Sequence, residues 1–352
     1  MTDTNILNIE NIQRKEISIN KKKNSKNNFC DFNNTFLILI FLLLLINLYY
    51  IFKVYSEQII EKIIINNSQK ESTSNSIYST KLNNFDNPQF ESFDVQNLEK
   101  IKFKIKDIIA LTFDEQKFLN GIIRKIKPKK IVEIGVACGG SSAIILNSIK
   151  DINEAKLFSI EKLSNCYMIP NKKAGFIVEE KFPELMNKWT LYRESITAKV
   201  IESIGKDIDL VFIDTMHITP GEMLDFLQVL PFLKEEAIVV LHDTFLMFYN
   251  GNVEKQKKNY SNNQILVYVR GELLLPNYNY KVFSHNIGAI KLCKGQNKFY
   301  RHYFMALGTQ WEFMPDNADL KLMRKFFMKY YGNKYVEIYD DAVEKNKIHL
   351  NK

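Results

Sequence analysis

The residues with the clearest capacity for chemistry form a glycine-rich turn, VEIGVACGGSS, at 132–142. The turn follows a predicted strand and opens a predicted helix. Gly135, Gly139 and Gly140 lack side chains, so the backbone can turn sharply and approach a ligand closely. The helix start supplies free N–H groups, and Ser141 can cap it or bond the ligand. The spacing is not that of the G-x-G-x-x-G fingerprint, and it predicts a site for a carboxylate or phosphate group.

Acidic residues accompany this turn at the ends of predicted strands. Glu133, two residues before Gly135, indicates a ligand that carries an ammonium group. Glu161 ends the second strand, where a carboxylate can accept both hydroxyl protons of a ribose. Glu194 and Ser195 end the third strand, within reach of a nucleobase. The alternative for these last three residues is a solvated position at a strand end.

A further cluster comes from the motifs FIDTMH and LHDT, which end two strands predicted to be neighbours. Asp214, His217, His242 and Asp243 would converge there on one crevice. Burying several charges without partners is unfavourable, so their convergence indicates a bound cation, a proton-transfer pair, or both. The two carboxylates suit Mg²⁺, and an added histidine suits Mn²⁺ or Zn²⁺. His217 can take a proton near neutral pH, although each histidine could instead be a structural hydrogen-bonding group.

The elements that position these motifs alternate between strands and helices from about residue 100 onward. Thr112 and Glu115 predict a capping box for a helix that ends before Pro128, and Thr219 predicts the cap of a helix that ends at Leu233. Further helices are predicted at 141–150 and 197–204. Short apolar runs predict strands at 131–135, 157–161, 189–194, 209–214 and 237–243, closed by a hairpin of 281–285 and 288–293.

These strands are apolar nearly throughout, so we expect helices on both faces of the sheet. The alternation then predicts an α/β fold with a doubly wound, mostly parallel, seven-stranded sheet. Sheets of this kind bind their ligands at the C-terminal ends of the strands, which is where the three groups of residues above are predicted to lie.

Together, VEIGVACGGSS, FSIE, FIDTMH with the helix PGEMLDFLQVLPFL, and VVLHDT resemble the class I S-adenosylmethionine-dependent methyltransferases of the family 24 type. These are related in pattern to catechol-type O-methyltransferases and to the cephalosporin hydroxylase-like group. The resemblance extends from Lys130 to Thr244 and more loosely to Cys293. It implies a Rossmann-like methyltransferase domain at 99–295 that transfers a methyl group to the oxygen of a hydroxylated acceptor.

The resemblance also implies roles by position. The cofactor S-adenosylmethionine would be held by Glu133, Gly135, Gly139, Gly140, Ser141, Glu161 and Ser195, with Glu133 near its ammonium and Glu161 on its ribose. Asp214 would be catalytic and a metal ligand, and Asp243 the second carboxylate for Mg²⁺ or Mn²⁺. His242 or Thr244 would be the third ligand. His217 stands where catechol-type enzymes carry a lysine base, and we expect it to be catalytic.

An apolar run at 36–52, FLILIFLLLLINLYYIF, predicts one transmembrane helix at 35–53, because a helix of this length spans roughly 25 Å. It separates a disordered polar tail at 1–34 from a linker at 54–98. Lysines flank the run on both sides, with more before it, which favours a cytoplasmic N-terminus. That orientation would place the domain away from the cytosolic cofactor pool, so the side of this single-pass membrane protein that carries the domain stays open.

The composition adds weaker indications. The formal net charge of +8 suits anionic lipid or an acidic substrate, or reflects only a lysine-rich composition, and no pattern indicates nucleic acid. The four cysteines are scattered and indicate neither a disulfide scaffold nor a zinc site. The aromatic-rich segment 296–352 is predicted to be helical and to pack on the domain. Its alternative is an acceptor-binding surface or the interface of a homo-oligomer.

The leading hypothesis is therefore an O-methyltransferase. The predicted membrane anchor favours a glycan or a lipid-linked sugar as the acceptor over a free small molecule. A nicotinamide-dependent oxidoreductase is the first alternative, but its glycine spacing differs and LHDT has no role in it. A membrane-tethered binding module without turnover is the second, and the intact set of Glu133, Glu161, Asp214 and Asp243 argues against it.

Overall fold

The computed structural model describes residues 92–105, 109–244, 259–276 and 286–350. All of them lie in the second of the two units into which the chain divides, Thr80–Lys352. The polar tail, the membrane span predicted at 35–53 and most of the predicted linker lie outside the described residues. None of the helices in the described ranges is long and apolar enough to cross a membrane.

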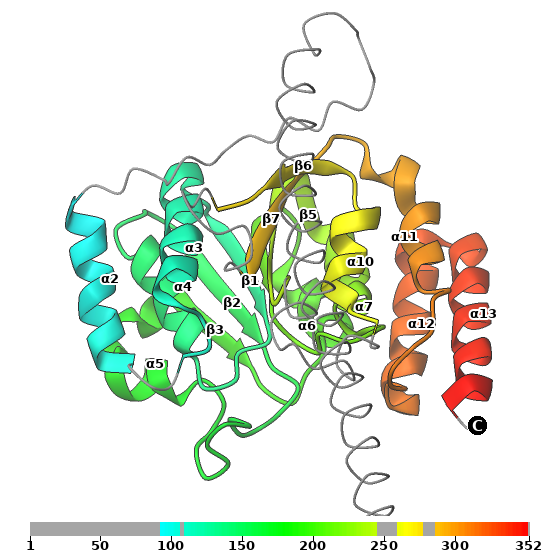
Figure 1. The fold of residues 1–352 in the computed structure, drawn as a ribbon, viewed down its shortest axis with the longest axis horizontal. Coiled ribbons are helices and arrows are strands. Elements are labelled where there is room, and N and C mark those ends of the chain that lie inside the picture. Colours follow the sequence, from blue (N-terminus) through cyan, green and yellow to red (C-terminus); the bar gives the residue numbers. More distant parts are fainter. Residues whose placement is uncertain (1–91, 106–108, 245–258, 277–285, 351–352) are drawn as a thin grey trace, which may run out of the picture. The chain divides into compact units, whose positions relative to one another are not determined.

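A seven-stranded sheet in the order β3-β2-β1-β4-β5-β7-β6 forms the centre of the domain (Figure 1). Its strands are β1 (Lys130–Ile134), β2 (Lys156–Ile160), β3 (Trp189–Tyr192), β4 (Ile208–Ile213), β5 (Leu233–His242), β6 (Gly271–Leu274) and β7 (Ile287–Leu292). The first five strands pair in parallel, and β7 is antiparallel to both of its neighbours. This confirms the predicted mostly parallel, seven-stranded sheet. The strand order reverses between β1 and β4, the kind of switch point at which such sheets bind ligands.

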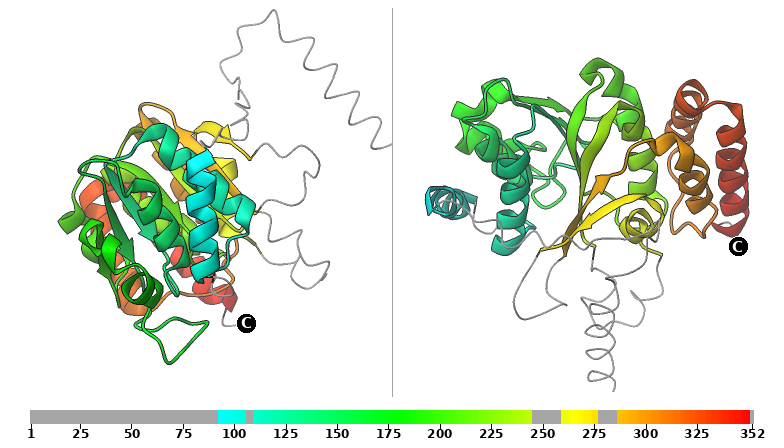
Figure 2. Two further views of the ribbon diagram at one scale, coloured as in Figure 1. Left: turned by 90° about the vertical axis from the view of Figure 1, so that its left-hand side faces the viewer. Right: turned by 90° about the horizontal axis from the view of Figure 1, so that it is seen from above.

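Helices cover both faces of the sheet (Figures 1 and 2). Successive residues of a strand point to opposite faces, so Leu210 and Phe212 join one apolar core while Val211 and Ile213 join the other. The first core is completed by α2 (Ser92–Ile105), α3 (Phe113–Ile126), α4 (Gly140–Ile149) and α5 (Phe176–Lys181). The second is completed by α6 (Thr197–Ile204), α7 (Gly221–Val229), α10 (Ser261–Tyr268), α11 (Tyr300–Ala306), α12 (Asn317–Tyr331) and α13 (Asn333–Leu350).

The N-terminal part of the domain agrees with the sequence in one element and differs in another. Thr112 and Glu115 form the predicted capping box of α3, with each side chain bonding the backbone N–H of the other residue. The domain begins earlier than predicted, because α2 lies within residues assigned to the linker at its start. Leu98 of α2 is fully buried, and burial of this apolar side chain holds the helix against α3 and α4.

Three predicted boundaries were wrong in detail. The hydroxyl of Thr219 donates to the carbonyl of Gln310, 2.7 Å away, so it does not cap α7. That helix ends at Val229, and a 3-10 turn at Leu230–Phe232 leads directly into β5. The hairpin partner of β7 is β6, and the predicted strand at 281–285 lies outside the described residues.

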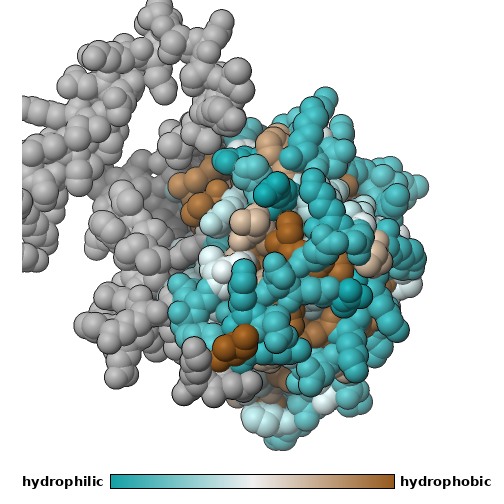
Figure 3. Space-filling view, turned by 90° about the vertical axis from the view of Figure 1, so that its right-hand side faces the viewer, coloured by the Kyte–Doolittle hydropathy of each residue, from teal (hydrophilic) through white to brown (hydrophobic). Residues whose placement is uncertain are grey.

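The C-terminal extension, residues 296–350, is helical and packs on α6, α7 and α10. Its aromatic rings meet mostly edge to face, for example Phe304 with Phe327 at 5.3 Å between centroids. Trp311 is fully buried, and its indole N–H donates to the carbonyl of Leu307 at 2.8 Å. The prediction that these aromatic residues pack as core is therefore confirmed. The outward face of the extension is mostly hydrophilic, with scattered apolar side chains (Figure 3).

Candidate active site

A cavity of about 610 Å³ opens at the C-terminal ends of the strands, beside the switch point between β1 and β4. Its volume suits a small-molecule or cofactor site, which typically occupies about 300–1,000 Å³. Many of the predicted site residues line it together: Gly135, Gly140, Ser141, Glu161, Ser195, Asp214, His217 and Asp243. The structure therefore brings the three predicted groups into one cleft, while Glu133, Gly139 and His242 do not line it.

The glycine-rich turn needs its first glycine for the junction between β1 and β4. Gly135 has a φ of +90°, and a Cβ there would lie 1.9 Å from the carbonyl oxygen of Asp214. Gly139, also with positive φ, faces Gly175, whose Cα would lie 2.9 Å from an added Cβ. Gly139 therefore serves the packing of two loops, and its predicted contact with the cofactor is not supported.

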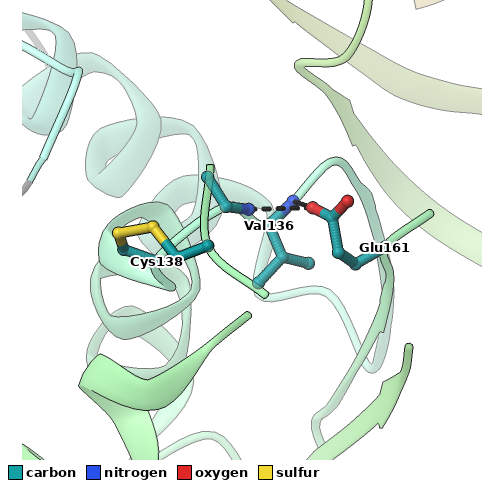
Figure 4. The surroundings of a disulfide bond; sticks show 5 residues. Val136, Cys138 and Glu161 are labelled. Carbon is teal, nitrogen blue, oxygen red and sulfur yellow. Dashed lines mark hydrogen bonds between the residues drawn. A yellow bond between two sulfur atoms is a disulfide. The ribbon is translucent and has the colours of Figure 1, made fainter. Parts of the chain in front are cut away.

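Glu161 holds the turn to the end of β2. One carboxylate oxygen accepts the backbone N–H groups of Val136 and Ala137, each at 2.9 Å (Figure 4). The other accepts the N–H of Leu163 at 2.8 Å. A carboxylate has about four acceptor positions, so about one is left for a ligand hydroxyl. This differs from the prediction that Glu161 would accept both hydroxyls of a ribose.

Glu133, predicted to lie near a ligand ammonium, is placed behind the cavity wall and does not line it. Its side chain is fully buried, and both oxygens accept hydroxyl groups, those of Ser141, Ser142 and Ser159, at 2.6 Å each. Burial raises the pKa of Glu133 to about 7, against the lowering effect of the three serines. It shares its face of β1 with Ile131, which points into the core around α4. Glu133 therefore fixes the first turn of α4 to β1 and β2.

This buried carboxyl predicts a pH-dependent difference between the wild type and a Glu133→Gln variant. The folded-state pKa of about 7 exceeds the ordinary 4.5, so the wild type loses stability as the pH rises between these values. Glutamine cannot ionise and escapes that loss. We expect the unfolding free energy of the variant, relative to wild type, to rise by about 3 kcal/mol between pH 4.5 and 8. Urea unfolding at several pH values measures this.

Glu154→Gln is the control. Glu154 is an exposed carboxylate, and the ammonium of Lys129 lowers its pKa, so its contribution has the opposite sign. The Glu154→Gln variant should lose stability relative to wild type as the pH rises, by a small amount. A difference between wild type and Glu133→Gln that stays constant over this pH range would contradict the buried-carboxyl account.

Asp214, His217 and Asp243 form the acidic centre of the cavity. One potential ligand atom from each lies within 4.8 Å of the others, which makes this group able to hold a metal ion. His217 places Nε2 2.9 Å from Asp243 and Nδ1 3.3 Å from Glu222. Although burial lowers it, these two carboxylates raise the pKa of His217 to about 10. His217 thus lies against two carboxylates at the cavity and is also one of the potential metal ligands.

His242, predicted as the third metal ligand, lies behind this centre and is only 4% exposed. Its Nδ1 is 3.4 Å from Asp214 and 3.3 Å from Asp243, and its Nε2 is 3.5 Å from Glu115. Burial opposes its charged form, but these carboxylates raise the pKa of His242 well above its usual value. As an imidazolium, His242 offsets the charge of these carboxylates. The histidine in the group of potential metal ligands is His217 and not His242.

Four residues around the centre were missed or given other roles by the sequence. Glu115 was assigned only to a helix cap, yet its carboxylate also accepts the backbone N–H of Asn286 at 3.1 Å. The Asn286 amide donates to Asp243. Glu222 is fully buried in the first turn of α7. Tyr167 lines the cavity, and burial together with the carboxylates of Asp214 and Asp243 raises its pKa. Glu222 lies in the quoted helix motif and Glu115 in the predicted capping box, but neither pattern indicates a role at the acidic centre.

A disulfide joins Cys138 of the glycine-rich turn to Cys166 (Figure 4). The expectation that the cysteines form no disulfide framework was wrong for this pair. Cys166 lies in the loop 162–175, which follows β2 and supplies Leu163, Tyr167 and Met168 to the cavity wall. The N–H of Gly175 donates to the carbonyl of Ala137 at 2.9 Å. The bond therefore fixes a wall of the cavity to the turn.

Removing this bond should destabilise the domain. The two cysteines are 28 residues apart, and cross-linking a loop of that length contributes about 3–4 kcal/mol through the entropy of the unfolded chain. We expect Cys166→Ser to lower the unfolding free energy by about this amount, measured by urea denaturation without reductant. Dithiothreitol should destabilise the wild type and leave the variant unchanged. Cys293→Ser, which removes a half-buried free thiol, is the matched control. Equal unfolding midpoints of wild type and Cys166→Ser would contradict the bond.

Comparison with known proteins gives one family match and several similar solved structures. Residues 132–244 match the family model Methyltransf_24, described as a methyltransferase domain. A search of curated protein sequences found no match. Similar solved structures include the O-methyltransferase TomG of Streptomyces achromogenes with bound S-adenosylmethionine, at 14% identity and a TM-score of 0.40, covering 58% of this chain and 91% of that chain. The O-methyltransferase of Bacillus cereus with S-adenosylhomocysteine is 11% identical, with a TM-score of 0.40. The similarity covers 58% of this chain and 92% of that chain.

The family match spans the glycine-rich turn, the end of β2 and both motifs of the acidic centre. Those segments supply many of the residues that line the cavity. Residues 132–244 are therefore similar to the methyltransferase domains of this family.

Proposed function

We propose that this protein transfers the methyl group of S-adenosylmethionine to a hydroxyl oxygen of its acceptor. The observation that carries the proposal is the shared cavity, in which the glycine-rich turn, Glu161 and the acidic centre meet. Methyl transfer requires the sulfonium methyl and the acceptor oxygen to be close and aligned. A cavity with a cofactor-binding turn at one side and carboxylates at the other suits this arrangement.

The residues present fit the cofactor. Gly135 and Gly140 leave the backbone accessible, and the start of α4 directs N–H groups toward a carboxylate. Glu161 keeps about one acceptor position for a ribose hydroxyl. Ser195, at the end of β3, lines the cavity at the position proposed for the nucleobase.

Asp214, His217 and Asp243 fit a divalent cation, because two carboxylates and an imidazole suit Mg²⁺ or Mn²⁺. Such a cation would lower the pKa of an acceptor hydroxyl and so ease loss of its proton. Asp214 and Asp243 would hold it, and His242 behind them would keep the carboxylates in place. Leu163, Met168 and other apolar residues of the wall would exclude water.

The proposals for the acceptor and for the location of the domain depend on features outside the acidic centre. The predicted membrane helix at 35–53 favours a glycan or a lipid-linked sugar over a freely diffusing acceptor. The lysines before that helix favour a domain on the non-cytosolic side, and the Cys138–Cys166 disulfide is typical of such oxidising compartments. Protection of the domain from added protease in sealed vesicles would support this side, and cleavage would exclude it.

Binding to the full chain in detergent, measured by calorimetry, tests the proposed function. We expect S-adenosylmethionine to bind in the micromolar range, with weak binding of NAD. Glu161→Ala should weaken the first, since it removes the proposed ribose contact, two bonds that hold the turn and one that holds Leu163. Tighter binding of NAD would favour an oxidoreductase. Cofactor binding without release of S-adenosylhomocysteine on any hydroxylated acceptor would favour a non-catalytic module.

A further inference from the structure

The C-terminal extension supplies part of the wall of the cofactor cavity. Phe313, Pro315, Asp319 and Met323 line the cavity from this side. The extension lies outside the residues matched by the methyltransferase family, 132–244.

Several bonds fix the segment just before Phe313. The backbone N–H of Trp311 donates to the side-chain oxygen of Asn346 at 2.8 Å. The backbone N–H of Glu312 donates to the carbonyl of Thr219 at 2.9 Å. The segment is thus held between α13 and the loop that leads into α7. Phe313 follows directly, so its ring is presented to the cavity by a rigid support.

A second tie joins the extension to the end of β2. The ammonium of Lys162, next to Glu161, lies 2.9 Å from the carboxylate of Asp316 and 2.7 Å from that of Asp319. Exposed ion pairs of this kind stabilise a fold little. Their value here is positional, because they place the start of α12 beside the residue proposed to hold the ribose.

The neighbours of this wall identify which part of the cofactor it would meet. Beyond Glu161, the lining residues of the domain include Ser195 and Ile196 after β3 and Leu224 and Gln228 on α7. The turn at Gly135, proposed for the methionine part, belongs to the other side of β2 in the strand order. Phe313 is half-buried and lines the same cavity as Ser195, and its ring offers an aromatic face on which a base can stack.

We propose that Phe313, supported by Met323, forms the nucleobase wall of the S-adenosylmethionine site. The C-terminal extension is then a cofactor-binding element of the enzyme. The inference rests on the proposed function, since it needs the cofactor in this cavity.

The test measures dissociation constants for S-adenosylmethionine and for 5′-methylthioadenosine, which lacks the amino-acid part, on the full chain. Phe313→Ala should raise both constants by the same factor, about 5- to 100-fold, which corresponds to the usual loss of one base–aromatic contact. Phe313→Trp should retain binding. Met323→Ala should weaken both ligands less than Phe313→Ala does.

The matched controls are Met328→Ala, which removes an exposed methionine from the same helix, and Tyr330→Ala, which removes a ring packed on Phe232. Neither residue lines the cavity, so both variants should bind as wild type does. Phe313→Leu, which keeps an apolar side chain but no ring, should weaken both ligands if Phe313→Ala does not fold.

The outcomes separate the two proposals. If the wild type binds no S-adenosylmethionine, the proposed function fails. If it binds and Glu161→Ala weakens it, but Phe313→Ala and Phe313→Leu leave both constants unchanged, only the nucleobase wall is refuted. A rise in the acceptor KM with unchanged cofactor binding would also refute it, by assigning Phe313 to the acceptor.

Discussion

Asp214→Ala is expected to abolish measurable Mn²⁺ binding and to lower the rate of methyl transfer by about 1,000-fold, while the domain stays folded. The carboxylate lines the cavity, belongs to the group of potential metal ligands and lies 3.4 Å from His242. Removing one preorganised electrostatic group from an active site commonly lowers kcat by about 100- to 1,000-fold. Loss of a ligand carboxylate lowers the rate further, because it weakens the binding of the cation.

The fold should survive because Asp214 supports β1 through its backbone, whose N–H donates to the carbonyl of Ile134 at 2.9 Å. Alanine keeps that bond. Titration of Mn²⁺ by calorimetry needs no knowledge of the acceptor, and release of S-adenosylhomocysteine follows the rate once an acceptor is found. Asp341→Ala, which removes an exposed carboxylate from α13, is the control. Unchanged Mn²⁺ affinity in Asp214→Ala would remove Asp214 from the site.

Local patterns in the sequence were sufficient to predict the sheet and the cleft at the ends of its strands. The runs around Val132, Phe158 and Val211 predicted buried parallel strands, since each is apolar on both faces. Residues that follow such strands were then predicted to meet, and Asp214 and Asp243 do meet. Both predictions use only geometry that is common to every parallel sheet.

The roles of Glu133 and His242 depend on which face of a strand each occupies. His242 is the last residue of β5 and shares the face of Val240, which packs in the core beside α3. It therefore points to Glu115, whereas Asp243 follows the strand and lines the cavity. The same alternation turns Glu133 toward α4. Side chains alternate between the two faces of a strand, and this alternation places His242 and Glu133 on the same face as Val240 and Ile131 of the core.

Contacts between distant segments could not be predicted in this way. The Cys138–Cys166 bond depends on how the loop 162–175 folds back on the glycine-rich turn, and a separation of 28 residues does not indicate pairing. The place of Phe313 depends on the packing of three helices against α6 and α7. Its aromatic neighbours in the sequence indicated core packing, which is where most of them lie.

Gly135→Ala is expected to be the most disruptive single change in the glycine-rich turn. The added Cβ would lie 1.9 Å from the carbonyl oxygen of Asp214, at a φ of +90° that alanine rarely adopts. Neither neighbour can move easily, because β1 and β4 are paired over their length and Asp214 is bonded to Ile134. We expect the unfolding free energy to fall by more than about 4 kcal/mol, measured by urea denaturation, with loss of cofactor binding.

Gly332→Ala separates the two causes of this loss. Gly332 has nearly the same φ, +86°, but no atom lies within 4 Å of the added Cβ. Gly332 has a ψ of 173°, a backbone region almost restricted to glycine, so its variant reports a conformational cost without a collision, about 1–3 kcal/mol. The excess in Gly135→Ala measures the collision with the β1–β4 junction, and equal losses in the two variants would contradict that collision. If Gly135→Ala folds by shifting the junction, Asp214 must shift with it. Mn²⁺ binding should then be lost although every ligand side chain is present.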